Sequence, residues 1–561
     1  MFELLAQAAD ASSAAPAVGI GAILSLILFI VASVWLGTVA QRVVERSRFI
    51  QGYFQGNRGL GAWTIALTAT VQSGGTFMGF PSLVYSSGWV VALWIASYMA
   101  VPLTGFAVIG KRIAQISRRT GAVTMPDLFR ARYASPTAGL ITSLLIILFL
   151  SIMMVAQFKA GAVVMKIAWP GTTSLALAED AESSIDTVYL IGLAVFGLTV
   201  VGYTLIGGFL AAVWTDLLQS VMMFFGVMIL VFLAMWAVGG LENASRKAVS
   251  NLEQVALERG KTPEEAQFVA SQYISGPGLK GDGSAFLPLT MAISFFFFWP
   301  FAGMASPASV VRIMACKDTS VLRKSIFLLA VYNMAIYIPL IAVCIAARAM
   351  MPNLEKTDEV VPRMALALTA DIPLGSWISG LILAAPFGAI MATVSCYLLV
   401  IASGLVRDVY QRFIHPKANE HELRRLTYFT MAIVGGIAAV LNISPVEKLQ
   451  MLVVFSSGCA ASSFLMPTLM MCYWRRATAA GTIAAMLSGA GASLALNLAG
   501  LFLAYKNTGQ FAKFTPYALA GFEPLLWGLL VSLVVGVIVS LFTRPPEEKL
   551  VSKLFDAPEP A

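Results

Sequence analysis

The sequence predicts an all-α polytopic membrane protein with about 13 transmembrane helices. Of its 561 residues, 58% are hydrophobic and only 12% are charged, whereas a typical soluble domain is about 25% charged. Uncharged runs of about 20 residues or more recur along the chain, and each is long enough to cross a bilayer. The basic residues lie in short loops between these runs. The net charge of +8 therefore reflects membrane topology, and we expect the lipid bilayer, not nucleic acid, as the macromolecular surroundings.

The apolar runs place the individual spans. The first run, 17–40, follows a segment without Lys or Arg and is too long for the apolar core of a signal peptide, so we expect it to span the membrane. The uncharged stretch 59–110 is twice the needed length and turns at 86–88, which gives two spans. The other spans are expected at 136–165, 187–206, 209–240, 284–305, 325–347, 373–406, 426–446, 449–474, 477–505 and 524–543.

The loop charges predict the orientation. Lys and Arg follow the first, third, seventh, ninth and eleventh spans, in segments that include Arg42, Arg118, Arg312, Arg407 and Arg475, whereas the loop after the fourth span is acidic. Basic loops stay in the cytoplasm. We therefore expect an inner (plasma) membrane protein with an extracytoplasmic N-terminus and a cytoplasmic C-terminus. The outer loop 242–283 has the composition of a surface helix.

Catalytic and metal-binding patterns are not found in the sequence. The five Cys form no CxxC pair, and both His lie in one polar loop. The apolar runs contain no Ser-His or paired-carboxylate arrangement, so we do not expect an enzyme.

Two apolar runs are interrupted by small and polar residues, at TATVQSGGT (68–76) and FFFFWPFAGMASPAS (295–309). Irregular backbone is tolerated at membrane depth only where it lines a cavity, and there it binds ions and solutes. Either cluster alone is equally consistent with close helix packing by small residues. If spans 2–6 and 7–11 are two five-helix units of opposite orientation, however, each break lies in the first helix of its unit, which favours a transporter.

Further polar residues lie inside the runs. Asp216 interrupts the sixth span, where a carboxylate is usually functional, although it could also reach the nearby inner surface. Thr393 and Ser395 lie in the ninth span, and such hydroxyls either bind ions or bond their own helix. In the fourth span, Gln157 and Lys159 are about 200° apart around the helix. We expect Gln157 to face the cavity and Lys159 to extend toward the outer surface.

Several motifs resemble one family. GYTLIGGF (202–209), continued by Trp214, Thr215, Asp216 and Gln219, resembles the signature of the sodium:solute symporter family. Four further segments look most like its pantothenate permease branch: LTATVQSGGTFMGFP (67–81), AVTMPDLFRARY (122–133), RIMACKDTSVLRKSI (312–326) and AAPFGAIMATVSCYLL (384–399).

The resemblance implies a fold and a domain organisation. It implies a five-plus-five inverted-repeat core of the leucine-transporter type. The expected parts are the N-terminus with peripheral helix 1 (1–48), the first repeat (49–240), an extracytoplasmic loop (241–283), the second repeat (284–476), and two peripheral helices with a cytoplasmic tail (477–561).

The resemblance also implies site residues. The sodium site would use Ala69, Gln72, Ala389, Ala392 and Thr393, and Asp216 would lie on the sodium path to the cytoplasm. Ala392 departs from the family pattern, because many relatives have a serine there. Solute contacts would come from Ser73, Thr76, Gln157, Gly303 and Ser306.

The implied function is sodium-coupled symport of a small organic solute, a carboxylate such as pantothenate, into the cell by alternating access. Na⁺ is the implied coupling ion. Because Ala392 lacks the hydroxyl that a serine would supply, a proton-coupled or differently specific carrier stays open as the alternative. A membrane solute sensor also stays open, since related cores are fused to signalling domains.

Overall fold

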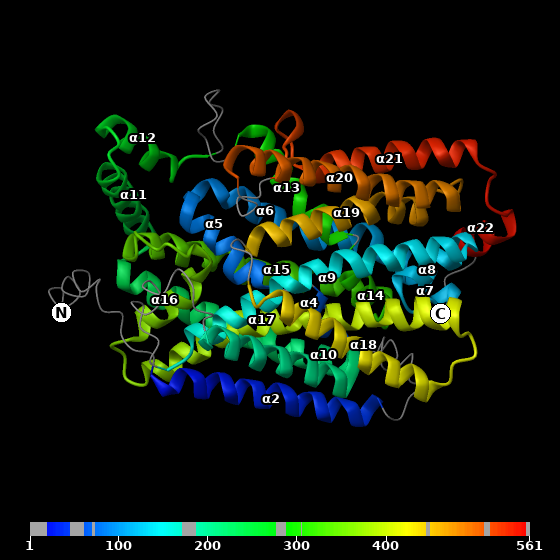
Figure 1. The fold of residues 1–561 in the computed structure, drawn as a ribbon, viewed down its shortest axis with the longest axis horizontal. Coiled ribbons are helices and arrows are strands. Elements are labelled where there is room, and N and C mark those ends of the chain that lie inside the picture. Colours follow the sequence, from blue (N-terminus) through cyan, green and yellow to red (C-terminus); the bar gives the residue numbers. More distant parts are fainter. Residues whose placement is uncertain are drawn as a thin grey trace.

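The structure is a computed structural model that describes residues 19–44, 61–69, 73–170, 187–276, 288–304, 306–444, 449–509 and 516–556. Every regular element in these ranges is helical, and the long helices run roughly along the long axis of the molecule (Figure 1). Within the described ranges, ten helices are long and apolar enough to cross a membrane, or eleven when one bent pair is counted as a span. This confirms the predicted class of all-α polytopic membrane protein.

The first half of the chain contains long helices and a series of short ones. These elements are α2 (Ile20–Val44), α4 (Ala62–Ala69), η2 (Gly75–Gly79), α5 (Phe80–Ser87), η3 (Gly88–Val91), α6 (Ala92–Val101), η4 (Pro102–Gly110), α7 (Lys111–Thr120), α8 (Met125–Tyr133), α9 (Pro136–Ile167) and α10 (Thr187–Val238). The Ser135 side chain accepts a hydrogen bond from the Ala138 N–H and so caps the start of α9.

The structure of the stretch 59–110 is the reason that fewer than 13 membrane-spanning helices are found in the described residues. This stretch was expected to form two spans, and it consists of short helices joined by the π-helical turns η2 and η4. Pro102, which begins η4, has no backbone N–H and disfavours a regular α-turn. None of these short helices alone is long enough to cross a membrane, so the exact number of 13 remains a prediction.

The expected boundary between spans 5 and 6 is found inside α10. Gly208 has φ 59° and ψ −146°, a conformation that favours glycine, and it separates the apolar helices Thr187–Ile206 and Ala211–Val238. These limits agree closely with the predicted spans 187–206 and 209–240. The glycine pair in the GYTLIGGF motif thus provides a turn between two membrane helices.

The second half begins with two helices outside the apolar runs. Its elements are α11 (Leu241–Glu258), α12 (Pro263–Gln272), α13 (Leu289–Met304), α14 (Pro307–Met314), α15 (Thr319–Met350), η5 (Thr357–Glu359), α16 (Val360–Thr369), α17 (Gly375–Ser403), η6 (Gly404–Ile414), α18 (Glu420–Leu441), α19 (Leu449–Tyr473), α20 (Ala479–Thr508), η7 (Leu519–Gly521), α21 (Pro524–Phe542) and α22 (Glu548–Phe555). Helices α11 and α12 confirm the helical character expected for 242–283.

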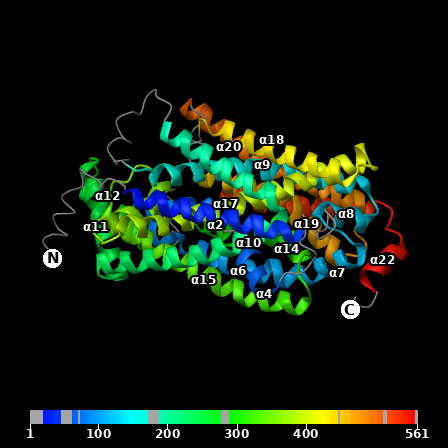
Figure 2. The same ribbon diagram turned by 90° about the horizontal axis from the view of Figure 1, so that it is seen from below.

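The two ends of the bundle differ. Helices α11 and α12 lie at one end, and α7, α8 and α22 lie at the other in both views (Figures 1 and 2). The second end is rich in arginine, and we call it the basic end. There the Phe555 ring of α22 lies 4.9 Å from the Arg112 guanidinium, 5.2 Å from that of Arg132 and 5.4 Å from that of Arg475. Cation–π contacts thus hold the C-terminal helix against α7, α8 and the end of α19.

Helix α17 occupies the centre of the bundle. It packs against α2, α9 and α10, and nearly all of its side chains from Ile382 to Ser403 are buried. Its Ile390 side chain lies beside Gly74, at the start of the first broken helix. The centre of α17 and the first break therefore meet in the middle of the molecule.

Candidate functional site

The first break lies between α4 and η2. Helix α4 ends at Ala69, and the described chain resumes at Ser73. The Ser73 hydroxyl accepts the Gly75 N–H at 3.1 Å, and the Ser73 N–H donates to the Thr76 hydroxyl at 3.3 Å. These bonds satisfy backbone groups that an interrupted helix leaves without partners. Ser73 and Thr76, both predicted to contact solute, therefore also stabilise the backbone conformation of the break.

Gln157 of α9 reaches the same break. Its side-chain Oε1 accepts the Gly74 N–H at 2.8 Å, and the side chain is completely buried. The Nε2 of Gln157 has no hydrogen-bond partner among the described residues. The structure thus places Ser73, Thr76 and Gln157 together, and it leaves one buried amide donor of Gln157 available for a ligand.

Glycine makes this approach possible. A Cβ atom on Gly74 would lie 2.7 Å from the Cβ of Ala160 and 3.1 Å from the Oε1 of Gln157. A side chain at this position would push the break away from α9. A Cβ on Gly79, at the end of η2, would collide with the side-chain amide of Gln450.

Gln450 is a polar residue of the site that the sequence analysis missed. It lies in the first turn of α19, is 8% exposed, and neither atom of its amide has a hydrogen-bond partner among the described residues. Burying an amide without partners costs free energy. Its position in the apolar segment LQMLVVF was the signal that could have identified it, because polar residues in membrane runs are usually functional.

An aromatic cluster borders the break. The Tyr337 hydroxyl lies 3.1 Å from the Thr76 hydroxyl, and the Tyr337 ring stacks on Tyr98 with centroids 4.0 Å apart. Tyr98 also stacks on Trp299 at 4.9 Å, and Phe80 meets Tyr337 edge to face. These rings give the site an apolar wall of the kind that small-molecule pockets have.

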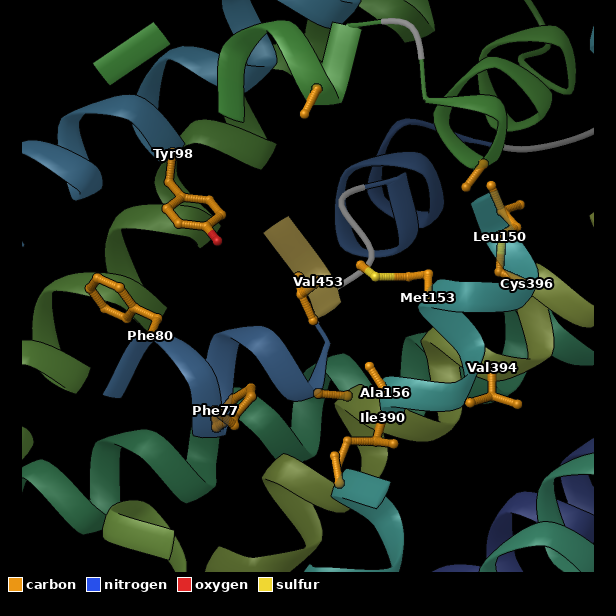
Figure 3. Close-up of a cluster of buried hydrophobic side chains, with 14 of the residues drawn as sticks. Phe77, Phe80, Tyr98, Leu150, Met153, Ala156, Ile390, Val394, Cys396 and Val453 are labelled. Carbon is orange, nitrogen blue, oxygen red and sulfur yellow. The ribbon is translucent and has the colours of Figure 1, made fainter. Parts of the chain in front are cut away.

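Figure 3 shows how apolar side chains surround the break. Val453 of α19 lies beside the start of η2, where a Cβ on Gly75 would be 3.2 Å from its side chain, and Ala156 and Ile390 lie next to each other. Tyr98 and Phe80 lie on the opposite side of the view. The polar groups of the site are therefore embedded in an apolar shell.

The second break separates α13 from α14, which are bent by 44° relative to each other. Ser306 lies at the N-terminus of α14 and lines a cavity of about 40 Å³ together with Met153 of α9 and Ser456 of α19. Gly303 instead allows close packing, because a Cβ there would lie 2.8 Å from a Val101 methyl group. Of the two predicted residues in this break, Ser306 faces a cavity and Gly303 contacts α6.

The predicted sodium residues on α17 are next to the first break. Ala389, Ala392 and Thr393 are buried, and the Thr393 hydroxyl donates to the Ala389 carbonyl at 3.0 Å. Ala69 ends α4, whereas Gln72 lies outside the described residues. Hydroxyl and carbonyl oxygens are ligands that a hard cation prefers. The α17 half of the predicted site therefore presents suitable oxygens in a buried position.

Asp216 pairs with an arginine that was expected in a loop and that lies in a helix. Arg312, counted among the loop cations that follow the seventh span, lies in α14, the second half of the broken span. Its Nη2 is 2.7 Å from the Asp216 carboxylate, and both side chains are 2% exposed. Its Nη1 donates to the Cys396 thiol of α17 at 2.9 Å. A buried acid in a membrane run needs a counter-charge, and this rule could have located Arg312.

The family model of the sodium:solute symporter family matches residues 53–489, which is more than half of the chain. The chain belongs to this family. Over 495 residues it is 29% identical to the sodium/pantothenate symporter of Haemophilus influenzae, covering 86% of this chain and 92% of that protein. It is 28% identical over 537 residues to the sodium/pantothenate symporter of Escherichia coli, covering 94% and 98%.

A solved structure has a similar fold. The substrate-bound, outward-open structure of a Na⁺-coupled sialic acid symporter matches with a TM-score of 0.67 at 18% identity, covering 94% of this chain and 99% of that chain. This likeness confirms the fold class that the resemblance implied.

Membership of the sodium:solute symporter family makes this chain a multi-pass transporter and not an enzyme. Sodium is the coupling ion of the family, and the bacterial relatives imply the inner membrane. The first break and the centre of α17, which the sequence analysis expected to bind solute and ion, lie next to each other in the structure.

Proposed function

We propose that this protein couples the inward movement of Na⁺ to uptake of a small organic carboxylate of the pantothenate class. The main support for the proposal is that the first break, Gln157 and the centre of α17 lie next to one another. An ion at Ala389 and Thr393 would order the same backbone whose Gly74 N–H bonds Gln157. Binding of one ligand would thereby favour the other, and a coupling of about 1–3 kcal/mol is ordinary for such sites.

The solute would bind between the two breaks. Ser73, Thr76 and Gln157, with the amide of Gln450, offer hydrogen bonds on one side, and Ser306 offers a hydroxyl on the cavity side. The names of the two bacterial relatives, both sodium/pantothenate symporters, support the solute class. The second break also provides the N-terminus of α14, where helix N–H groups would stabilise a carboxylate.

The basic end would face the cytoplasm. Arginines gather there in α7, α8 and η6, as the positive-inside rule requires of a cytoplasmic face. Sodium would then leave past Asp216, which lies between the centre of α17 and the basic end. On this route the ion pair of Asp216 with Arg312 would have to separate during sodium release.

The test is uptake of labelled pantothenate and other small carboxylates by proteoliposomes. We expect accumulation with an inward sodium gradient at constant pH, since moving one charge inward yields about 2.3 kcal/mol per 100 mV. Accumulation driven by a proton gradient without sodium would favour the proton-coupled alternative, consistent with Ala392 in place of a serine. Binding without any uptake would favour a sensor.

A further inference from the structure

A short segment covers the site at the end opposite to the basic end. We call residues 351–359, between α15 and α16, the lid segment. The Tyr85 hydroxyl of α5 donates to the Met351 carbonyl at 2.5 Å and accepts the Leu354 N–H at 3.1 Å. The Ser82 and Thr357 hydroxyls are 2.5 Å apart. The lid segment is thus held on α5, which directly continues the first break.

Asp358 connects the lid segment to the other side of the site. Its carboxylate lies 3.7 Å from the Lys159 ammonium of α9 and accepts the Leu449 N–H at 3.4 Å. Leu449 directly precedes Gln450, and Lys159 lies on α9 one helix face away from Gln157. The lid segment therefore bridges α5, α9 and the start of α19.

The ion pair is partly buried, with the Lys159 side chain 11% exposed and that of Asp358 20% exposed. A motion that moves the lid segment away from α9 would break the contact between Asp358 and Lys159. A partly buried ammonium that loses its carboxylate is destabilised unless another anion replaces it. Lys159 lies only about 3 Å further along the α9 axis than Gln157.

We infer that Lys159 recognises the carboxylate of the incoming solute and that Asp358 takes over the same ammonium when the lid segment closes. The inference rests on the carboxylate solute proposed above. Lys159 would then determine specificity for anionic solutes. Asp358 would replace the solute carboxylate as the partner of the Lys159 ammonium. While the lid segment is away from α9, the Lys159 ammonium attracts an incoming anion.

The experiment measures KM for sodium-driven uptake of the labelled acid in the full-length protein, with Lys159→Gln, Lys159→Arg and the matched control Lys166→Gln on the same helix. Lys159→Gln should raise KM about tenfold, while Lys159→Arg and Lys166→Gln stay within about twofold. Raising the ionic strength should increase KM of the wild type but not that of Lys159→Gln.

A second variant separates recognition from closure of the lid segment. Lys159→Asp/Asp358→Lys keeps an ion pair between the lid segment and α9 but places a negative charge on α9. Loss of acid uptake with normal protein level supports recognition by Lys159, and wild-type KM in this variant would overturn it. An unchanged KM in Lys159→Gln would overturn the inference alone, whereas failure of the wild type to take up any acid would overturn the proposed solute class as well.

Discussion

The carboxylate of Asp216 and the guanidinium of Arg312 form a 2.7 Å ion pair that is almost completely buried. The pair connects α10 with α14, the half of the second broken helix nearer the basic end. Since Arg312 also donates to Cys396, three helices meet at one cation. The conformations of these helices are thereby coupled to the ionic state of Asp216.

Replacing Asp216 alone should affect folding as well as transport. Because Asp216→Asn leaves the Arg312 charge buried without a carboxylate, we expect destabilisation of about 3–5 kcal/mol together with slower uptake. Thermal unfolding of the purified variant in detergent measures this effect.

The double variant Asp216→Asn/Arg312→Gln removes both charges and should recover most of the lost stability. If Asp216 serves the sodium path, sodium-driven uptake stays low in this well-folded variant. Recovery of uptake together with stability would show that the pair is only structural.

Thr393→Val removes a hydroxyl at nearly constant volume. If this hydroxyl binds sodium, the sodium concentration for half-maximal uptake should rise about tenfold, corresponding to about 1.4 kcal/mol. Thr393→Ser keeps the hydroxyl and serves as the control. Sodium titrations that are identical for Val and Ser would exclude Thr393 as a ligand.

Ala392→Ser should act in the opposite direction. It restores the oxygen that many relatives have, at a buried position one residue before Thr393. We expect the half-maximal sodium concentration to fall by about threefold to tenfold. An unchanged sodium dependence, with uptake driven by a pH gradient, would favour proton coupling.

Gln450→Met tests whether the buried amide is kept for binding. Removing this buried amide, which has no hydrogen-bond partner in the described part of the chain, should stabilise the protein by about 1–3 kcal/mol. Uptake should fall at the same time, since functional polar groups reduce stability. A lower unfolding temperature would instead show that the Gln450 amide makes bonds that stabilise the fold.

Gly74→Ala tests the close approach of the first break to α9. The new Cβ would lie 2.7 Å from the Cβ of Ala160, so we expect lost uptake, and Ala160→Gly should partly restore it. Gly436→Ala on α18 is the control, because nothing lies within 4 Å of its Cβ position. It should be neutral or stabilise by about 1 kcal/mol.

The sequence patterns predicted the fold well where hydropathy is decisive. Long apolar runs became long helices, and even the short boundary at Gly208 was located, because glycine and chain length both required a turn. For the stretch 59–110, the expectation of two spans stays a prediction. Hydropathy does not distinguish a continuous helix from short helices joined by π-helical turns, which depend on local packing and on Pro102.

The candidate site was predicted in part. Ser73, Thr76 and Gln157 come together because interrupted apolar runs need polar partners for their backbone groups. Arg312 was misplaced because its charge resembled that of the neighbouring loop residues, although the helix continues through it. Gln450 was missed because its neighbours Gly75 and Gly79 belong to a distant segment of the sequence, and their approach to its side chain exists only once the helices are packed.

The contact between Arg312 and Cys396 gives this protein a native chemical reporter. In the present conformation the Cys396 thiol is buried and accepts a hydrogen bond from the guanidinium, so it is shielded from water-soluble reagents. Separation of the Asp216–Arg312 pair would uncover it. The alkylation rate of Cys396 therefore measures how often the exit opens, and it does so without an introduced label.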